Sequence, residues 1–341
     1  MGMGNMISVR RPPASGGGGD NRGTGTLPWL PGAVPLMLAP MQGLTNRALR
    51  GWFVQQVRPD VVFTEYVRVQ TGARKVLSNT DRLEAASAAD GVPLVVQLIG
   101  ADSETLVTAA DMVQALGAVH LNINLGCPYG RMTGNSAGGA LLQDPIRLAA
   151  LLVRLRKCIA GGFSVKVRAG FESPDEVLSL LPMFEECGID FLILHPRTVR
   201  QRYAGVADHG VTAEVVRRTA LPVIANGDVF TAAVGRRVLA ETGAAGLMLG
   251  RGAIADPYLF ARLRGERADV PQPAERREEL RAYLEDLLAR YLELFCGEQQ
   301  VLRKMKEVLA HLHDPELAKT VQALRRCKKM VLFREIVAGI S

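Results

Sequence analysis

The sequence contains few cysteines and no long apolar run. Its five cysteines, among 341 residues, include no Cys-x-x-Cys pair, so neither a disulfide framework nor a four-ligand zinc site is indicated. No stretch of 18 or more apolar residues is present, and the N-terminus lacks the charged and apolar segments of a secretory signal. We therefore expect a cytoplasmic protein with no membrane association and no bound metal ion.

The sequence also has fewer acidic than basic residues. There are 41 Lys and Arg residues against 34 Asp and Glu, which gives a net charge of +7 and a pI of about 9.3. This excess favours a polyanionic partner, although modestly basic enzymes without such a partner are common. Hydrophobic residues make up 48% of the chain, enough for one large core or two ordinary ones.

Apolar periodicity is absent from residues 1–33, where RRPPASGGGGDNRGTGTLPWLPG is dominated by Gly and Pro. Such a segment cannot form a core, and we expect a disordered tail over 1–33. From residue 34 onward, short apolar runs alternate with helix-period segments, which is typical of parallel strands buried on both faces. Eight runs occur, at 35–41, 60–67, 93–100, 118–126, 163–170, 190–198, 222–228 and 246–252.

Eight strand and helix units over residues 34–265 match a (β/α)8 TIM barrel in number and length. A doubly wound open sheet is the alternative. Polar residues near the carboxyl ends of successive runs favour the barrel, because in a barrel those ends converge on one mouth, whereas an open sheet would scatter them along an edge. These residues are Gln97, Asn122, Asn124, Cys127, Lys166, Arg168, His195, Arg197, Asn226, Asp228 and Arg251.

A helical segment follows the last run. PQP at 271–273 is a linker, and helix-period runs at 274–295, 299–313 and 315–336 predict a small helical domain over 271–341. Residues 299–334 hold nine Lys or Arg and three Asp or Glu, whereas residues 275–298 hold four against seven. The basic half is where a polyanion would bind.

Two groups of residues at the expected barrel mouth indicate a ligand. ANGD at 225–228 and LGRGA at 249–253 place glycines and an arginine where barrels commonly bind a phosphate, although tight turns are an alternative role. Lys166 would be costly in an apolar core without a partner, and Gln97 and His195 pose the same problem more mildly. Together these three suggest donors around a planar heterocycle.

The motifs that contain these residues resemble those of the tRNA-dihydrouridine synthases, flavin enzymes that reduce a uracil base in transfer RNA. The similarity follows all eight runs in order, from about residue 35 to residue 334. TEYVRV and the long helical tail look most like the subgroup called dihydrouridine synthase C, which acts on the D-loop uridine at tRNA position 16. The matching motifs are APMQGLTN at 39–46, TEYVRV at 64–69, VQLIG at 96–100, NINLGCP with AGGALLQDP at 122–145, SVKVRAG at 164–170, HPRT at 195–198, PVIANGD at 222–228 and GLMLGRGA at 246–253.

The resemblance implies a bound FMN and a proton donor, Cys127. Uracil is a conjugated acceptor, so hydride from flavin N5 would reach C6 while a proton from Cys127 reaches C5. A cysteine thiol is mostly protonated at neutral pH and can act as this acid. The residues implied along the flavin ring are Pro40, Met41 and Gln42; those implied as hydrogen-bond donors to it are Gln97, Lys166 and His195; those implied around its ribityl phosphate are Asn226, Gly227, Asp228, Gly250 and Arg251.

NADPH as the hydride source follows from the resemblance alone, since no GxGxxG motif follows an expected strand. Three positions depart from the family's usual pattern: Gln42, Pro196 and His209. We expect the enzyme to be a monomer.

A tRNA substrate would need cations, because a base inside folded tRNA must be flipped out at a cost that contacts to the backbone offset. Near the mouth, the expected substrate contacts are Arg68, Asn122, Asn124, Arg197 and Tyr203; in the basic half they are Arg303, Lys304, Lys306, Arg325 and Arg326. A small-molecule flavin dehydrogenase of the dihydroorotate or dihydropyrimidine type is the closest alternative, and it would not need the basic helical tail. A catalytically silent RNA-binding barrel would keep the tail but would have no use for Cys127.

Overall fold

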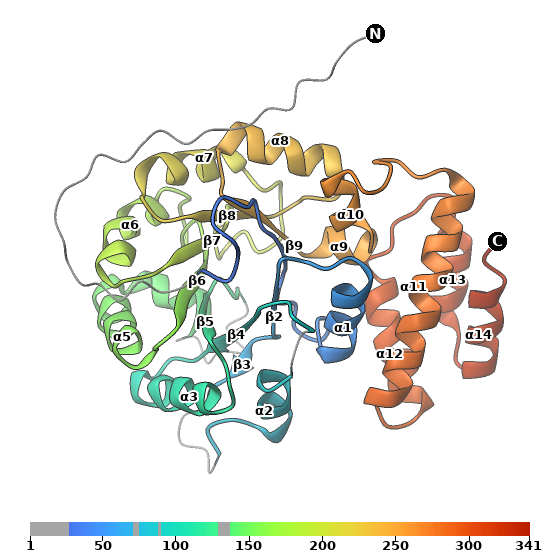
Figure 1. The fold of residues 1–341 in the computed structure, drawn as a ribbon, viewed down its shortest axis with the longest axis horizontal. Coiled ribbons are helices and arrows are strands. Elements are labelled where there is room, and N and C mark those ends of the chain that lie inside the picture. Colours follow the sequence, from blue (N-terminus) through green and yellow to red (C-terminus); the bar gives the residue numbers. More distant parts are fainter. Residues whose placement is uncertain (1–26, 71–74, 88–89, 129–136) are drawn as a thin grey trace, which may run out of the picture.

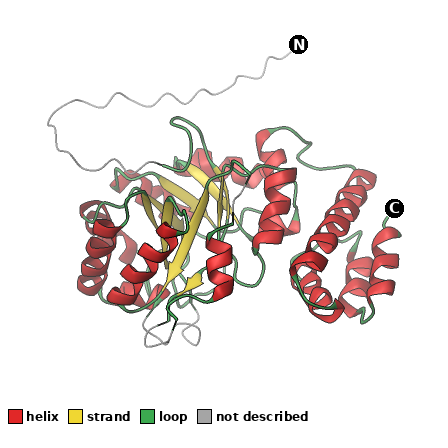
Figure 2. Ribbon diagram, turned by 60° about the horizontal axis from the view of Figure 1, so that its bottom comes forward, coloured by secondary structure: helices red, strands yellow, loops and turns green. Residues whose placement is uncertain are grey.

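The computed structural model describes residues 27–70, 75–87, 90–128 and 137–341. Eight parallel strands form a closed barrel (Figure 1), because β2 pairs with β1 on one side and with β4 on the other. The predicted TIM barrel is confirmed, and Figure 2 shows its strands enclosed by helices. The barrel strands are β1 (Leu36–Leu38), β2 (Val61–Phe63), β4 (Leu94–Ile99), β5 (His120–Leu125), β6 (Gly162–Arg168), β7 (Phe191–His195), β8 (Val223–Asn226) and β9 (Gly246–Leu249).

Helices on the outside connect these strands. Their starts follow the sequence: the Asp102 and Asp144 side chains accept backbone N–H groups as caps, and Pro145 occupies a first helical position that needs no N–H donor. The outer elements are α1 (Arg47–Gln56), α2 (Asn79–Ala85), α3 (Ser103–Ala115), the short 3-10 helix η1 (Gly138–Gln143), α5 (Pro145–Cys158), α6 (Glu176–Glu186), α7 (His209–Arg218), α8 (Ala232–Thr242), α9 (Arg251–Ala255) and α10 (Leu259–Arg264).

The second expected run, 60–67, does not form one strand. It ends as β2 at Phe63, and a separate two-residue strand, β3 (Val67–Arg68), pairs with the end of β4. The Thr64 hydroxyl accepts the Gln97 backbone N–H, and Glu65 and Tyr66 leave the sheet. This break places residues 64–66 at the barrel mouth.

Large apolar side chains fill the inside of the barrel, among them Met37, Phe63, Phe191 and Ile193. Trp29 packs edge-on against Phe191, at the amino end of β7, with ring centroids 4.9 Å apart. The composition placed the end of the disordered tail at residue 33, and this boundary is wrong, because Trp29 packs against the barrel and the Ala33 N–H donates to the Leu30 carbonyl in a turn. The rest of that segment, 1–26, lies outside the described residues.

The C-terminal helices form the predicted helical domain beside the barrel, as Figures 1 and 2 show. The third expected helical run, 315–336, is two helices, because Cys327 and Lys329 adopt extended backbone angles between them. No helix in the described ranges is long and apolar enough to cross a membrane. The domain consists of α11 (Pro273–Leu294), α12 (Glu298–Leu309), α13 (Ala318–Arg326) and α14 (Met330–Ala338).

The helical domain and the barrel share one hydrophobic core. Trp52 of α1 packs against Tyr283 of α11 with ring centroids 4.6 Å apart, and both side chains are buried. A buried ion pair between Arg262 of α10 and Glu279 of α11 joins the two parts at another point. Burying an aromatic side chain of this size stabilises the fold by roughly 1.5–3 kcal/mol, so the helical domain is fixed against the barrel.

Candidate active site

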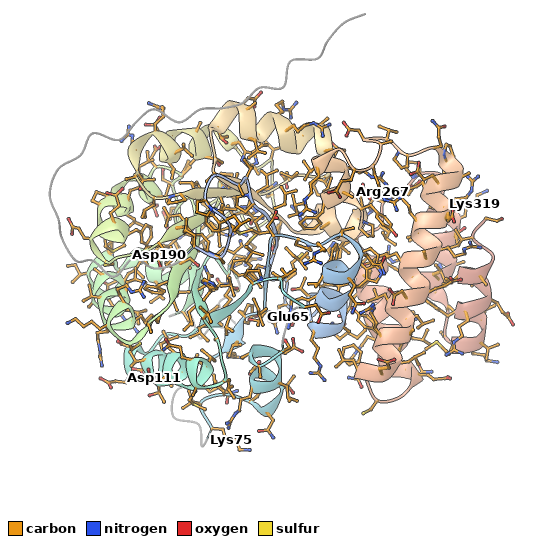
Figure 3. All side chains as sticks on the ribbon, in the orientation of Figure 1. Glu65, Lys75, Asp111, Asp190, Arg267 and Lys319 are labelled. Carbon is orange, nitrogen blue, oxygen red and sulfur yellow. The ribbon has the colours of Figure 1, made fainter. Side chains whose placement is uncertain are left out.

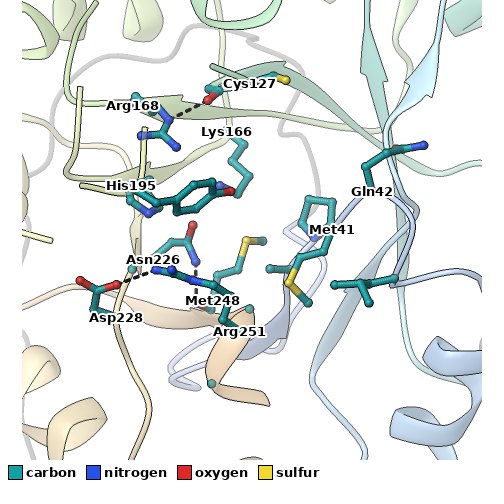
Figure 4. A pocket seen from close by; sticks show the side chains of 18 of the residues that line it. Met41, Gln42, Cys127, Lys166, Arg168, His195, Asn226, Asp228, Met248 and Arg251 are labelled. Atoms are coloured by element: carbon teal, nitrogen blue, oxygen red, sulfur yellow. Dashed lines mark hydrogen bonds and ion pairs between the residues drawn. The ribbon is translucent and has the colours of Figure 1, made fainter. Parts of the chain in front are cut away.

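A cavity of about 500 Å³ opens at the carboxyl ends of the barrel strands (Figure 4). This volume is typical of a cofactor or small-molecule site. Fourteen of the residues named from the sequence line it: Pro40, Met41, Gln42, Asn124, Cys127, Lys166, Arg168, His195, Tyr203, Asn226, Gly227, Asp228, Gly250 and Arg251.

Lys166 extends from β6 into this cavity. Within the described residues its Nζ atom has no hydrogen-bond or ion-pair partner. Burial, followed by repulsion from the Arg168 guanidinium, lowers the pKa of the Lys166 ammonium to about 7. A group that accepts hydrogen bonds or carries negative charge would complete this site.

His195, at the end of β7, is a neutral donor. Its Nδ1 accepts the Arg197 backbone N–H at 3.3 Å, so the neutral ring carries its proton on Nε2. Burial, and then the nearby charge of Lys166, lower the pKa of His195 to about 2. The ring therefore offers one N–H to the cavity without adding positive charge to that of Lys166.

The segment that carries Cys127 is held from three sides. The Asn124 Oδ1 atom accepts the backbone N–H groups of Gly126 and Cys127 at 3.0 and 2.9 Å. Arg168 donates from Nε to the Gly126 carbonyl at 2.7 Å, and the Cys127 carbonyl accepts the Gly139 N–H at 3.2 Å. A Cβ atom on Gly139 would lie 2.5 Å from a Val199 methyl group, so glycine permits this close packing. The later part of the predicted motif, 129–136, lies outside the described residues.

Gln97 and Asn122 do not line the cavity. The Gln97 Nε2 donates to Asn122 Oδ1 at 2.8 Å, Asn124 Nδ2 donates to Gln97 Oε1 at 2.9 Å, and Asn122 Nδ2 donates to Ser164 at 2.8 Å. Both residues are fully buried. This network orients Asn124, so Gln97 and Asn122 act on the Cys127 segment indirectly, through the Asn124 side chain.

The ends of β8 and β9 form one edge of the cavity. Gly227 has a φ of +130°, and a Cβ atom there would lie 2.9 Å from the Ala207 Cβ, so only glycine fits. Asp228 accepts from Arg251 at 2.8 Å and from Arg197 at 2.6 Å. Although burial opposes it, hydrogen bonding and these charges lower the pKa of the Asp228 carboxyl.

Arg197 was expected to contact RNA, and its placement does not support this. Its side chain is 2% exposed and donates to Asp228 and to the carbonyls of Ala204 and Gly205. All its donors face protein, so Arg197 holds the loop after β7. Of the positions that depart from the family pattern, Gln42 lines the cavity, and His209 Nε2 lies 3.0 Å from the Gly227 carbonyl.

Several cavity residues were not named from the sequence as site residues, among them Tyr66, Phe230 and His311. Burial, followed by the neighbouring Cys127, raises the pKa of Tyr66 to about 12, so its phenol stays protonated. His311 follows α12 and brings the helical domain to the cavity wall. Tyr66 stands in the TEYVRV motif, which was a signal, whereas no sequence pattern distinguishes His311.

The basic residues of the helical domain differ in what they contact. Arg303, Arg325 and Arg326 are exposed and Lys306 is partly buried; within the described residues none of the four has an ion pair or a side-chain hydrogen bond. Lys304 instead faces the barrel and is engaged there, so it was wrongly expected to reach a phosphate. Arg68, on β3, is exposed and likewise has no such partner in the described part of the chain.

Comparison with known proteins relates the chain to enzymes that modify tRNA. The family model described as dihydrouridine synthase matches residues 37–335. A tRNA-dihydrouridine(16) synthase of Cupriavidus necator is 31% identical over 317 residues, which cover 89% of this chain and 97% of that protein. A probable tRNA-dihydrouridine synthase of Rhodobacter capsulatus is 32% identical and covers 67% and 70%. A tRNA-dihydrouridine synthase B of Pseudomonas aeruginosa is 31% identical and covers 79% and 80%.

Among solved structures, that of morphinone reductase in complex with tetrahydroNAD is similar to this chain with a TM-score of 0.51. The identity is 13%, and the match covers 75% of this chain and 94% of that one. This likeness shows the barrel fold.

Proposed function

Because the chain belongs to the dihydrouridine synthase family, we propose that it binds FMN in this cavity and reduces a uridine of tRNA to dihydrouridine. The observation that carries the proposal is the orphaned Lys166 ammonium in a cavity that Cys127 also lines. A partly buried cation without a partner is costly, and a ring with carbonyl and nitrogen acceptors would offset that cost. The residues present therefore fit a flavin.

The cavity offers separate places for the ring and for the phosphate. Lys166 and the His195 Nε2–H would hold the acceptor atoms of the ring, and Met41 lines the same cavity. Gly227 allows close approach of a phosphate, and Arg251 is the cation on that side. A flavin held here would supply the hydride that C6 of a conjugated uracil ring accepts.

Cys127 is the proton donor in this proposal. The uracil ring must gain a proton at C5, and the thiol is the acid that Asn124 and Arg168 hold at the cavity wall. Tyr66, kept protonated by burial, lies beside it. Asn124 and Arg168 therefore hold the backbone that carries the thiol at the cavity wall.

Three observations support tRNA over a small molecule as the substrate. The helical domain shares a core with the barrel, so its position relative to the cavity is fixed. His311 extends the cavity wall from that domain, and Tyr203, 47% exposed, stands at the mouth. Exposed cations on α12 and α13 supply charge for phosphates.

The relative that matches along 89% of this chain is named for uridine 16, and we extend that position to this protein.

The test uses purified protein under anaerobic conditions. The expected result is a yellow protein that releases FMN, is reduced by NADPH faster than by NADH, and forms dihydrouridine in an unmodified tRNA transcript. A protein without flavin would overturn the proposal. Turnover of free dihydropyrimidines without action on tRNA would favour the small-molecule dehydrogenase instead.

A further inference from the structure

Lys304 lies on α12, which also carries Arg303 and Lys306, yet its side chain points toward the barrel. Its side chain is 16% exposed, and its Nζ donates to the Gly43 carbonyl at 2.9 Å and to Glu307 Oε2 at 2.7 Å. The Phe295 ring lies 6.0 Å from the same nitrogen. Lys304 therefore binds the peptide backbone of the loop after β1.

Glu65 holds the other side of the same residue. The Gly43 backbone N–H donates to Glu65 Oε2 at 2.8 Å. Glu65 follows β2 and lies on the side of the barrel that faces the helical domain (Figure 3). The N–H and C=O groups of one glycine are thus bound by side chains from two separate segments, one on the barrel and one on the helical domain.

Gly43 is part of the turn that forms the edge of the cavity. The backbone N–H groups of Leu44 and Thr45 both donate to the Met41 carbonyl at 3.0 Å, and the Thr45 hydroxyl accepts the Met41 N–H at 2.8 Å. Gly43 has a φ of +84°, a conformation that other residues adopt only with strain. Met41 and Gln42 of this turn line the cavity. A shift of the Gly43 peptide would therefore displace the cavity wall.

We propose that Lys304 and Glu65 are positioning residues for the flavin, which clamp the Gly43 peptide and so fix Met41 and Gln42 against the ring. The proposal rests on the flavin site proposed above and adds to it a role for the helical domain. That domain is part of the cofactor site, through Lys304, as well as a surface for the substrate. Neither side chain touches the cavity, so both act through the turn.

The experiment measures flavin affinity, the visible spectrum of the bound flavin and its reduction potential, in full-length protein without tRNA. Lys304→Met removes the charged donor, and the flavin Kd should rise by about tenfold, with a shifted spectrum and potential. Lys304→Arg keeps a cationic donor and should stay within about threefold of the native Kd. Glu65→Leu should match Lys304→Met, while Glu65→Gln, which keeps an acceptor, should resemble the native protein.

Two comparisons separate a clamp from general destabilisation. The double variant with Lys304→Met and Glu65→Leu should weaken flavin binding by less than the product of the single effects, because both act through Gly43. Lys319→Met, an exposed lysine on the far side of the helical domain in Figure 3, should change no flavin property.

The outcomes distinguish the two proposals. If native protein binds flavin and Lys304→Met changes only the melting temperature, the clamp is wrong and the flavin site stands. If Lys304→Met does not fold, Gly43→Ala tests the turn directly, because an added Cβ meets no atom closer than 3.5 Å but the backbone is strained. A native spectrum and potential in Gly43→Ala would also overturn the clamp. Native protein without flavin would refute the proposed function itself.

Discussion

Replacing Lys166 with methionine should stabilise the flavin-free protein and weaken flavin binding at the same time. Methionine has a similar length, is apolar and needs no partner in a buried site. Lysine at this position is therefore a cost to the empty fold, which a ligand offsets. The two effects have opposite signs, which separates a ligand-binding lysine from one that serves the fold.

The size of the first effect follows from the pKa of Lys166. Burial and Arg168 lower that pKa from 10.5 to about 7, and unfolding restores the ordinary value. At pH 7 and below, the charged lysine therefore lowers the free energy of unfolding by roughly 3–5 kcal/mol. Between pH 7 and 10.5 the unfolded chain binds more protons than the folded protein. The stability of the native flavin-free protein thus rises with pH there, and its difference from Lys166→Met shrinks.

Urea denaturation of both flavin-free proteins at pH 6, 7 and 9 measures the first effect, and flavin titration followed by fluorescence measures the second. Loss of a charge-assisted hydrogen bond should weaken flavin binding about 10- to 100-fold. In the native protein, flavin affinity should also fall as pH rises above 7, because Lys166 loses its proton. The reasoning is refuted if Lys166→Met is less stable than the native protein at pH 7 or binds flavin equally well.

Three other residue changes test the remaining parts of the site. Cys127→Ala should retain flavin, reduction by NADPH and tRNA binding, yet lower the single-turnover rate of dihydrouridine formation about 10²- to 10⁴-fold; an unchanged rate would exclude it as the proton donor. Replacing both Arg303 and Lys306 with alanine should make the negative slope of log tRNA affinity against log salt shallower by roughly 0.7–0.9 per lost contact. Lys157→Ala, which changes an exposed lysine on α5, should leave the slope unchanged. Equal slopes for the native protein and the double variant would mean that Arg303 and Lys306 contact no phosphate. Burial raises the pKa of Glu65 from 4.5 to about 7, so between these pH values the folded protein keeps a proton that the unfolded chain has lost. The free energy of unfolding should therefore fall by roughly 3 kcal/mol from pH 4.5 to 7, and Glu65→Gln should flatten this pH profile in urea denaturation. An unchanged profile in Glu65→Gln would mean that Glu65 is not the titrating group.

The barrel could be predicted from the sequence because its strands are buried on both faces and read as continuous apolar runs. The same logic located the cavity, since polar residues such as Lys166 and His195 interrupt these runs at their carboxyl ends. The break between β2 and β3 could not be predicted, because 60–67 is apolar enough to continue as one strand and only its pairing with β4 shows where it leaves the sheet.

Side-chain direction was the part of the site that sequence reasoning missed. Arg197 and Lys304 were both expected to contact RNA. Arg197 instead donates to Asp228, and Lys304 donates to the Gly43 carbonyl. Asp228 and Gly43 supply the acceptors, and only the folded chain brings them close. His311 reaches the cavity because α12 ends there, a position that depends on how the helical domain packs.

The central claim is that this protein uses Cys127 to form dihydrouridine in tRNA. The most direct measurement maps dihydrouridine at each D-loop uridine in tRNA from cells that lack the protein and from the same cells supplied with native protein or with Cys127→Ala. The account predicts loss of dihydrouridine at uridine 16, full recovery with native protein and little recovery with Cys127→Ala. Dihydrouridine that persists at every position in cells lacking the protein would contradict it.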